Sequence, residues 1–445
     1  MAGAEARVSA GTLGAVAAFA GARWGRRPHD RAALEAMQQT RLARYLRDVL
    51  PRAPFYRDRP RTLAELPIVD KATTLARFAE FNTVGVSLDR ALEVALAAER
   101  SRDFAPTLPG GITVGLSSGT SGTRGVFLVS DAERARWAGV LLARLLTTAS
   151  LRRLAGVGRP LRIAFFLRAN SNLYATLGSR RIAFDFHDLL EPLDAHVARL
   201  NTSRPDVLAA PPTVLRLLAE AASSGGLAIA PRQVVSVAEV LEADDADAIT
   251  RAWGTPVQQV YQATEGFLGA TCAHGRIHLN EDLLHIEPEW IADGTPTPTR
   301  FHPIVTDFTR TTQVVARYRL DDVLRVAEGD CPCGSPTRSL AAIEGRADDV
   351  LWASGEGGRP VAIFPDVVRR TMALVNGLRD YRLEQQSSTW HVRLQPPEHD
   401  IAVAVRRELA AMTARMGAVP PFVQVDPWVD APLTEKRRRI RCLTR

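Results

Sequence analysis

Hydrophobic positions in the first 60 residues follow the spacing of a helix. The apolar residues that carry this pattern are Leu34, Met37, Leu42, Tyr45, Leu46 and Val49. Residues three or four positions apart lie on one face of a helix, so the segment is predicted to be helical. Pro51 and Pro54 follow it directly, and we expect the helix to end there.

From residue 111 onward, short apolar runs alternate with helical segments. Residues 163–167, 206–209 and 234–237 are candidate strands. After the second of them, one side of a predicted helix carries Val214, Leu215, Leu217, Leu218 and Ala221. Strands that alternate with helices indicate an α/β fold with substantial parallel sheet.

The pattern changes in the last third of the chain. Residues 276–320 are richer in β-branched and aromatic residues, with Pro and Thr at turns, which predicts a β-type subregion. A Gly-rich break at residues 355–358 follows the segment 345–349, so we place a domain boundary near residue 345. We expect a large N-terminal domain over residues 1–345 with mixed and parallel sheets, and a small α+β C-terminal domain over residues 346–445.

Composition and charge narrow the class of protein. Hydrophobic residues make up 46% and charged residues 24%, which is ordinary for a globular protein. The net charge is +7, but all except two of the 56 basic residues are arginines scattered along the chain. The one basic run is Lys436–Arg439, which taken alone fits a phosphate-backbone contact or a targeting signal. Because the arginines are scattered along the chain, we expect no nucleic-acid partner.

A membrane partner is not expected either. The stretch from Val8 to Ala22 is mildly apolar, but it is rich in small and hydroxyl residues and shorter than a membrane span. No charged region precedes it as in a signal peptide. We therefore expect a cytoplasmic protein.

The strongest local motif is a loop of glycines and hydroxyl residues. It consists of Ser117, Ser118, Gly119, Thr120, Ser121, Gly122, Thr123, Arg124 and Gly125. Glycines permit close approach of the backbone, and a concave row of N–H groups with added hydroxyls can hold a polyphosphate. A flexible surface turn has the same composition, and this alternative stays open from the loop alone.

The surroundings of the loop separate it from two familiar phosphate-binding motifs. Residues 112–114 and 126–129 read as strands before and after it, and a helix begins only later, with Ser130 and Glu133 as a capping box. A strand–loop–strand arrangement lacks the lysine of the P-loop and does not open a helix as the dinucleotide fingerprint does.

The loop resembles the phosphate loop of the adenylate-forming superfamily, which includes acyl-CoA synthetases, peptide-synthetase adenylation domains and luciferases. Within it, the sequence is most similar to the branch of phenylacetate-CoA ligase and coenzyme F390 synthetase. That family commonly has Lys-Pro after the second glycine, whereas this chain has Thr123 and Arg124. The resemblance implies that Arg124 supplies the cation, as a wider planar group.

Three further segments resemble motifs of the same superfamily, in the same order. In residues 261–265 the resemblance places Mg²⁺ on Glu265 and the α-phosphate on Thr264. It places adenine near Tyr261 and near Ala238 and Glu239, which come earlier in the chain. Residues 318–322 resemble the ribose-binding motif, with Asp322 on the hydroxyls and Asp321 in place of a glycine. Residues 345–349 resemble the hinge motif, which contributes Arg346 to the nucleotide site and Asp348 as the pivot of a mobile C-terminal domain.

The chain has only two lysines, Lys71 and Lys436. The segment 432–437 resembles the C-terminal motif whose lysine bridges the reacting carboxylate and the α-phosphate, which implies a catalytic role for Lys436. A compact ammonium enters a tight site where a guanidinium does not. A disordered basic tail is the alternative. Lys71 lies in a segment similar to the start of the phenylacetate-ligase branch, and we interpret it as structural.

Cysteine and histidine residues suggest a structural zinc site. Cys331 and Cys333 form a tight thiolate pair, while Cys272, His274 and His278 offer another thiolate and two imidazoles. Three cysteines and one histidine are a common structural zinc set. By resemblance His278 is a better ligand than His274. Reduced cysteines without a metal are the alternative.

The resemblance implies ATP- and Mg²⁺-dependent adenylation of a carboxylic acid, aromatic or otherwise unsaturated, with release of pyrophosphate. CoA, an amine, a carrier thiol or nitrite is the second nucleophile, and bare AMP transfer to a hydroxyl is also open. Residues that follow a predicted strand form a candidate acid pocket, namely Arg168, Asn170, Asn172 and Tyr174. The rival class is a non-catalytic protein that binds nucleotide or nucleic acid.

Overall fold

The computed structural model describes residues 10–58, 62–117, 124–156, 158–168, 176–292, 297–355 and 357–444. The chain forms two compact units. The first contains Met1–Glu287, Ile304–Arg319 and Ala327–Ala341, and the second contains Pro288–Pro303, Leu320–Val326 and Ala342–Arg445. Because three strands have residues in both units, the boundary near residue 345 stays a proposal, and the two units are described separately.

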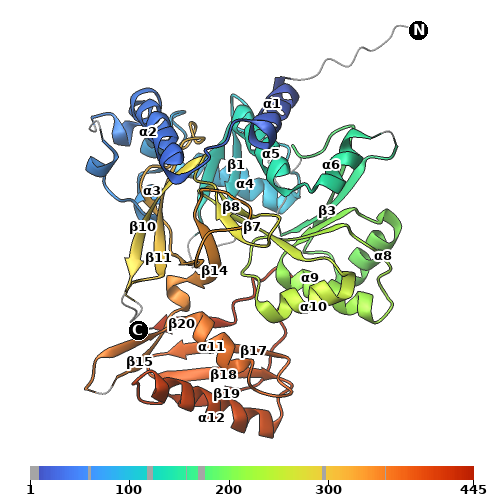
Figure 1. Ribbon diagram of the computed structural model, residues 1–445, viewed down its shortest axis with the longest axis vertical. Coiled ribbons are helices and arrows are strands. Elements are labelled where there is room, and N and C mark those ends of the chain that lie inside the picture. Colours follow the sequence, from blue (N-terminus) through green and yellow to red (C-terminus); the bar gives the residue numbers. More distant parts are fainter. Residues whose placement is uncertain are drawn as a thin grey trace. The chain divides into compact units, whose positions relative to one another are not determined.

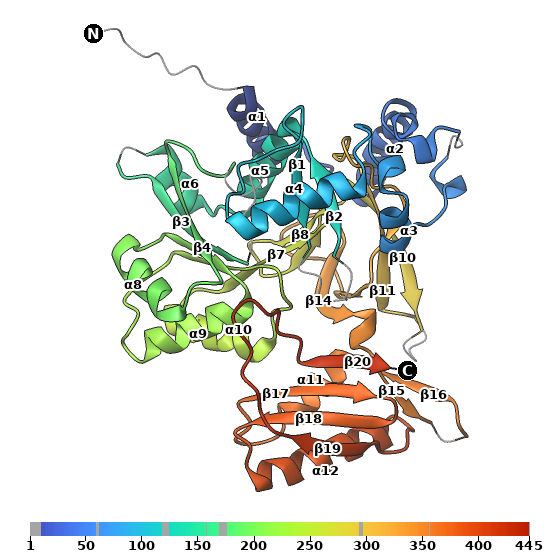
Figure 2. The same cartoon turned by 180° about the vertical axis from the view of Figure 1, so that it is seen from behind.

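The N-terminal part of the first unit is helical, as the apolar spacing predicts. Helix α1 (Ala10–Trp24) packs against α5 (Asp131–Leu145), and both views show them side by side (Figures 1 and 2). Helix α2 (Arg31–Asp48) begins at the N-cap Asp30, whose carboxylate accepts a hydrogen bond from Ala33 N. The short elements that follow are η1 (Leu50–Arg52), η2 (Pro54–Tyr56), η3 (Leu63–Glu65), α3 (Lys71–Ala76), η4 (Phe78–Phe81) and α4 (Leu88–Ser101).

A hairpin of β1 (Thr113–Leu116) and β2 (Val126–Val129) follows α4. The two strands are antiparallel, which confirms the predicted strand–loop–strand arrangement. Apolar side chains of α4 and η4 pack against this hairpin, and α4 lies across it in Figure 2. Helix α5 then begins with a complete capping box, in which Ser130 and Glu133 each bond to the backbone of the other.

The centre of the first unit is a sheet with strand order β14–β9–β8–β7–β6–β5–β3–β4. Its strands are β3 (Leu161–Leu167), β4 (Ile182–Asp188), β5 (Val207–Ala210), β6 (Gln233–Ser236), β7 (Val257–Ala263), β8 (Gly266–Thr271), β9 (Ile277–Leu279) and β14 (Ser339–Arg346). Strands β4, β3, β5, β6 and β7 are parallel, and β7, β8 and β9 are joined antiparallel. The α/β prediction is confirmed.

Helices α8 (Leu193–Ser203), α9 (Pro212–Ser223) and α10 (Ala243–Trp253) connect parallel strands, and α9 and α10 contact each other (Figure 1). Helix α6 (Thr148–Ala155) lies between α5 and β3 in the chain. Buried side chains of β3, β5 and β6 form an apolar core with α5 and α6. The predicted β-type subregion, residues 276–320, contains β9, β10 (Leu284–Ile291), β11 (Arg300–Asp307) and β12 (Tyr318–Arg319), and β13 (Asp322–Val326) follows it.

The second unit has an α+β core of its own. Its C-terminal sheet has the order β19–β18–β17–β20, and its other elements are η5 (Ala347–Asp349) and the hairpin β15–β16. The bounds are β15 (Leu351–Ser354), β16 (Pro360–Ile363), α11 (Pro365–Met372), β17 (Asp380–Gln386), β18 (Thr389–Gln395), α12 (His399–Arg415), β19 (Phe422–Asp426) and β20 (Ile440–Thr444). Trp390 is fully buried in the core that the sheet shares with both helices. In the described part of the chain, no helix combines the length and apolar character needed to cross a membrane.

Candidate active site

The neck of the glycine-rich loop is closed by two hydrogen bonds. Ser117 N donates to Gly125 O at 2.8 Å, and Gly125 N donates to the Ser117 hydroxyl oxygen at 2.6 Å. The predicted phosphate-binding residues Ser118, Gly119, Thr120, Ser121, Gly122 and Thr123 lie outside the described residues. The described part therefore fixes where the loop leaves and rejoins the β1–β2 hairpin.

Arg124 is engaged within the protein. Its guanidinium forms a bidentate ion pair with Glu99, with Nη1 to Oε2 at 2.7 Å, and Nε donates to Ser117 O at 3.1 Å. The hydrogen bond from Arg124 lowers the pKa of Glu99, which keeps that carboxylate charged. The cation that the resemblance assigned to the phosphates is thus compensated by a carboxylate of α4.

Glu133 joins the helix after the loop to the segment after β11. Its carboxylate is buried and accepts hydrogen bonds from Ser130 N at 2.8 Å, Thr311 N at 2.6 Å and Thr312 N at 3.0 Å. Burial raises the pKa of Glu133, but the charge of Arg310 and these hydrogen bonds outweigh it and lower the pKa. The start of α5 is therefore held in one position relative to residues 311–312.

Thr264 and Glu265 form the turn between β7 and β8. A Cβ atom on Gly266, the next residue, would lie 2.6 Å from Oδ2 of Asp307, so any other residue there would displace that carboxylate. A cavity of about 60 Å³ adjoins this turn. Its walls come from β2, α5, the β7–β8 turn and the end of β11, and include Phe127, Glu133, Trp137, Gln262, Thr264, Asp307 and Arg310. The turn and the phosphate-loop hairpin therefore meet at one cavity.

Asp307 is a second buried carboxyl group in the wall of this cavity, and no sequence motif marks it. It is 2% exposed, and its Oδ1 accepts hydrogen bonds from Thr309 N at 2.7 Å and from the Thr309 hydroxyl at 2.6 Å. Burial raises the pKa of Asp307 to about 6, although Thr309 and Arg310 oppose the shift.

Asp307→Asn should flatten the pH dependence of stability between about pH 4 and pH 6. A raised folded-state pKa means that the folded chain keeps a proton which the unfolded chain loses in this range. The free energy of unfolding should therefore fall as the pH rises through it, by roughly 3 kcal/mol in total for a shift from 3.8 to about 6. Urea unfolding at several pH values measures the slope. Asp89→Asn, on the exposed side of α4, is the control, and an equal slope in Asp307→Asn and wild type would contradict the prediction.

Ala238 and Glu239 follow the carboxyl end of β6. Ala238 has a left-handed backbone with φ of 68°, a conformation that a residue with a side chain adopts at a cost. Thr213 Oγ1 donates to Glu239 Oε2 at 2.7 Å and holds that carboxylate. Because β6 and β7 are adjacent and parallel, their carboxyl ends lie at the same edge of the sheet, where α/β proteins bind ligands. Tyr261 on β7 is 6% exposed.

The second unit brings the ribose and hinge motifs together. Arg346 Nη2 lies 3.3 Å from Asp321 Oδ2, and Ala347 N donates to Asp321 O at 2.7 Å. The aspartate that replaces the usual glycine is therefore an ion-pair partner of the hinge segment. His302 Nδ1 lies 2.9 Å from Asp322 O, which fixes the backbone beside the predicted ribose contact.

The three arginines of the basic run 436–439 form ion pairs within the second unit. Arg437 Nη2 and Arg439 Nε lie 2.8 Å and 2.9 Å from Asp380 Oδ1. Arg438 points to other carboxylates, with Nη2 at 2.8 Å from Asp348 Oδ1 and Nε at 2.9 Å from Asp349 Oδ1. Three arginines with internal partners are not a free basic face, so the reading as a nucleic-acid contact loses its support.

The four predicted metal ligands lie in one cluster. The ligand atoms of Cys272, His278, Cys331 and Cys333 are all within 4.8 Å of one another. Strand β9 carries His278, which is buried, whereas His274 is exposed. Burial lowers the pKa of His278, so its imidazole stays neutral as a metal ligand must. A set of three sulfurs and one nitrogen at this spacing fits tetrahedral Zn²⁺.

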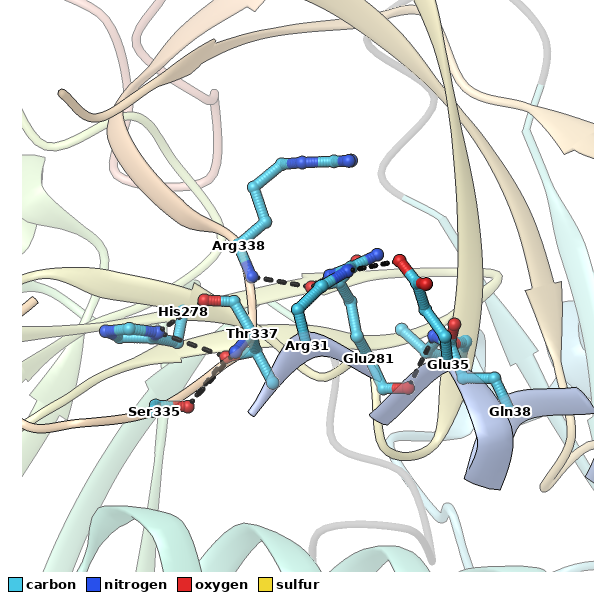
Figure 3. A network of polar contacts seen from close by, with 9 residues as sticks. Arg31, Glu35, Gln38, His278, Glu281, Ser335, Thr337 and Arg338 are labelled. Atoms are coloured by element: carbon cyan, nitrogen blue, oxygen red, sulfur yellow. Dashed lines mark hydrogen bonds and ion pairs between the residues drawn. The ribbon is translucent and has the colours of Figure 1, made fainter. Parts of the chain in front are cut away.

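A polar network connects this cluster to the N-terminal helices (Figure 3). His278 Nδ1 donates to Thr337 O at 3.1 Å, which leaves Nε2 toward the cysteines. Arg338 N donates to Glu281 at 2.6 Å, and Arg31 binds both oxygens of the same buried carboxylate at 2.9 and 2.8 Å. Hydrogen bonds to the ring nitrogen that does not face the metal orient a histidine as a ligand.

Comparison with known proteins gives matches to solved structures. No protein-family model and no curated protein matches the sequence. Solved structures do match. A 2-hydroxyisobutyryl-CoA ligase with bound acyl-AMP is similar over 92% of this chain and 88% of its own, with a TM-score of 0.62 and 18% identity. The GH3.15 acyl acid amido synthetase is similar over 93% of both chains, with a TM-score of 0.57 and 12% identity.

Amide bond synthetase McbA from Marinactinospora thermotolerans is similar over 74% of this chain and 69% of its own, with a TM-score of 0.51 and 15% identity. At identities this low, the structural match establishes the fold alone. The chain has the fold of the adenylate-forming ligases, with a large α/β part and a second α+β part, so the resemblance drawn from the motifs is confirmed at that level. The phenylacetate-CoA ligase branch stays a prediction.

Proposed function

We propose that this protein is an ATP- and Mg²⁺-dependent ligase that joins a carboxylic acid to AMP and then transfers the acyl group to a second nucleophile. One observation carries the proposal. The carboxyl ends of β6 and β7 share a sheet edge, and the turn after β7, with Thr264 and Glu265, shares a cavity with the phosphate-loop hairpin. A nucleotide on that edge has its phosphates beside Thr264.

In the proposed reaction the acid's carboxylate attacks the α-phosphorus, and a new P–O bond forms. The bond to the bridging oxygen breaks, and pyrophosphate leaves with the electron pair. Mg²⁺ on Glu265 would neutralise charge on the phosphates. Asp322 would hold the ribose, and Lys436 would stabilise the charge that develops on transfer. Most of the rate enhancement then comes from position and electrostatics.

CoA is the second nucleophile we propose, and its thiol would displace AMP from the acyl-adenylate. Matched structures include CoA ligases and also amide-forming enzymes, which supports a thiol or an amine as acceptor. We propose an aromatic or unsaturated acid. The test is a screen for pyrophosphate release with aliphatic, hydroxylated and aromatic acids, with and without CoA or amines. Absence of release with every acid would remove the catalytic proposal in favour of nucleotide binding alone.

We also propose that Cys272, His278, Cys331 and Cys333 hold a structural Zn²⁺. Four protein ligands leave no open position for a substrate, so the ion would stabilise the fold around β9 and take no part in the chemistry.

Arg438→Ala should reduce kcat for adenylation by about tenfold and change KM for ATP little. Arg438 ties the segment that carries Lys436 to the hinge residues Asp348 and Asp349, so its loss should misplace the lysine without removing a nucleotide contact. Arg438→Lys should recover part of kcat, because one charge remains. Steady-state pyrophosphate release measures both constants.

The control is Arg407→Ala, since Arg407 is 72% exposed and pairs only with its neighbour Glu408 among the described residues. A loss of thermal stability in Arg438→Ala with unchanged kcat would show that this arginine has a purely structural role.

A further inference from the structure

The phosphate loop lacks a lysine, and the arginine in that place has a partner. Arg124 binds Glu99 through both terminal nitrogens and Ser117 O through Nε, so all three of its nitrogens point at protein oxygens. A guanidinium held by a carboxylate on one side and a carbonyl on the other offers little charge to a ligand. The polyphosphate needs another cation.

Lys71 lies at the neck of this loop. Its Cε atom is 3.6 Å from the point that a Cβ atom on Gly125 would occupy, and the Ser117 hydroxyl is 3.3 Å from the same point. Lys71 is therefore in contact with the place where the loop leaves β1 and rejoins β2. Its side chain is half-buried, whereas lysine is usually exposed.

Neighbouring residues fix the backbone of Lys71. Asp70 caps α3 and accepts a hydrogen bond from Thr73 N at 2.8 Å. Val69 pairs with β12 at the start of the ribose motif, because Val69 N donates to Arg317 O at 3.0 Å and Arg319 N donates to Val69 O at 2.8 Å. The start of α3 is thus held by backbone bonds to residues 317–319.

Apolar packing holds α3 against the hairpin. Leu75 on α3 and Phe78 after it belong to one cluster with Val126 and Leu128 of β2. Phe78 is 2% exposed and Leu128 is fully buried, so the contact is part of the core. A lysine on so short and well-anchored an element reaches the loop from a defined direction.

We infer that Lys71 is a phosphate-binding residue, whose ammonium meets the β- and γ-phosphates of ATP at the Ser117–Gly125 neck. It takes the place of the lysine that the loop lacks. This inference rests on the proposed function, since it requires ATP on this loop. It replaces the structural role that the sequence alone suggested for Lys71.

The first test compares ATP with AMP. Lys71→Gln should weaken binding of Mg·ATP roughly 10- to 100-fold, the usual effect of losing one hydrogen bond to a charged group. AMP has no β- or γ-phosphate, so its dissociation constant should stay within about twofold. Arg407→Gln, which removes an exposed cation of α12 that pairs with its neighbour Glu408, is the control and should bind both nucleotides as wild type does. Isothermal titration calorimetry measures all six constants.

The second test uses the unaltered protein. Lys71 and Lys436 are its only lysines, so a limiting amount of acetylating reagent followed by mass spectrometry reads each amine separately. At a Mg·ATP concentration about ten times the dissociation constant, roughly one tenth of the protein is free. Acetylation of Lys71 should then be about tenfold slower with Mg·ATP, and AMP should not slow it. This result does not depend on whether a variant folds.

Three outcomes overturn the inference alone. The first is equal ATP affinity in Lys71→Gln and wild type, and the second is equal weakening for ATP and AMP. The third is an acetylation rate of Lys71 that bound ATP does not change. Failure of the wild-type chain to bind ATP would instead overturn the proposed function, and the inference with it.

Discussion

Lys436→Ala should lower the rate of ATP–pyrophosphate exchange roughly 10²–10³-fold while ATP affinity changes little. The reason is that the ammonium acts on charge that develops during transfer and contributes little before it. Arg437, Arg438 and Arg439 are held by carboxylates of the second unit, so none of these cations is placed to substitute for the lysine. Exchange of labelled pyrophosphate into ATP, with the best acid from the screen, measures the effect.

Lys436→Arg serves as the companion variant, and it should recover little activity because a planar guanidinium is wider than an ammonium. Full exchange activity in Lys436→Ala would exclude this lysine from the reaction. A loss of ATP binding that grows with salt concentration would favour a basic binding tail instead.

Removal of the zinc ligands should have the largest effect on stability. Purified protein should contain about one zinc per chain, and Cys331→Ser should lose most of it and unfold several degrees lower. Cys331 is buried and lies 3.7 Å from Cys272, so a hydroxyl there leaves the other ligands without a complete set. Elemental analysis and thermal unfolding measure the two effects.

The chain offers a matched control for this prediction. Cys442 is the fourth cysteine, lies on β20 and does not belong to the cluster, so Cys442→Ser should keep both zinc and thermal stability. His278→Ala should resemble Cys331→Ser, whereas His274→Ala should resemble wild type. A zinc content near zero in the wild-type chain would end the proposal of a metal site.

The local sequence pattern was sufficient to predict the strands and the helix that surround the glycine-rich loop. Short apolar segments predicted the strands on both sides of the glycine-rich loop, and Ser130 with Glu133 predicted the start of α5. These features depend on neighbours within a few residues, which the sequence displays directly. The cysteine pairs were also recognisable, because few residue types bind zinc. The structure then selected His278 over His274 through its place on a buried strand.

Contacts between distant segments could not be predicted in this way. The ion pair of Arg124 with Glu99 and the approach of Lys71 to Gly125 both depend on how α3 and α4 pack on the hairpin. Asp307 gives no signal either, since a carboxylate at the end of a strand is usually exposed. Each of these groups changes the chemistry of the site, and each became visible only when the packing was known.

The bonds of helix α2 also impose an order on biosynthesis. Arg31 and Gln38 bind Glu281, and Tyr45 binds the carbonyl of Arg310, across some 250 residues of intervening chain. Helix α2 is therefore synthesised long before these partners, and it waits for them until the chain has been made as far as residue 310. During that interval the apolar face of α2 lacks these native partners, which makes the nascent chain a natural client for chaperones.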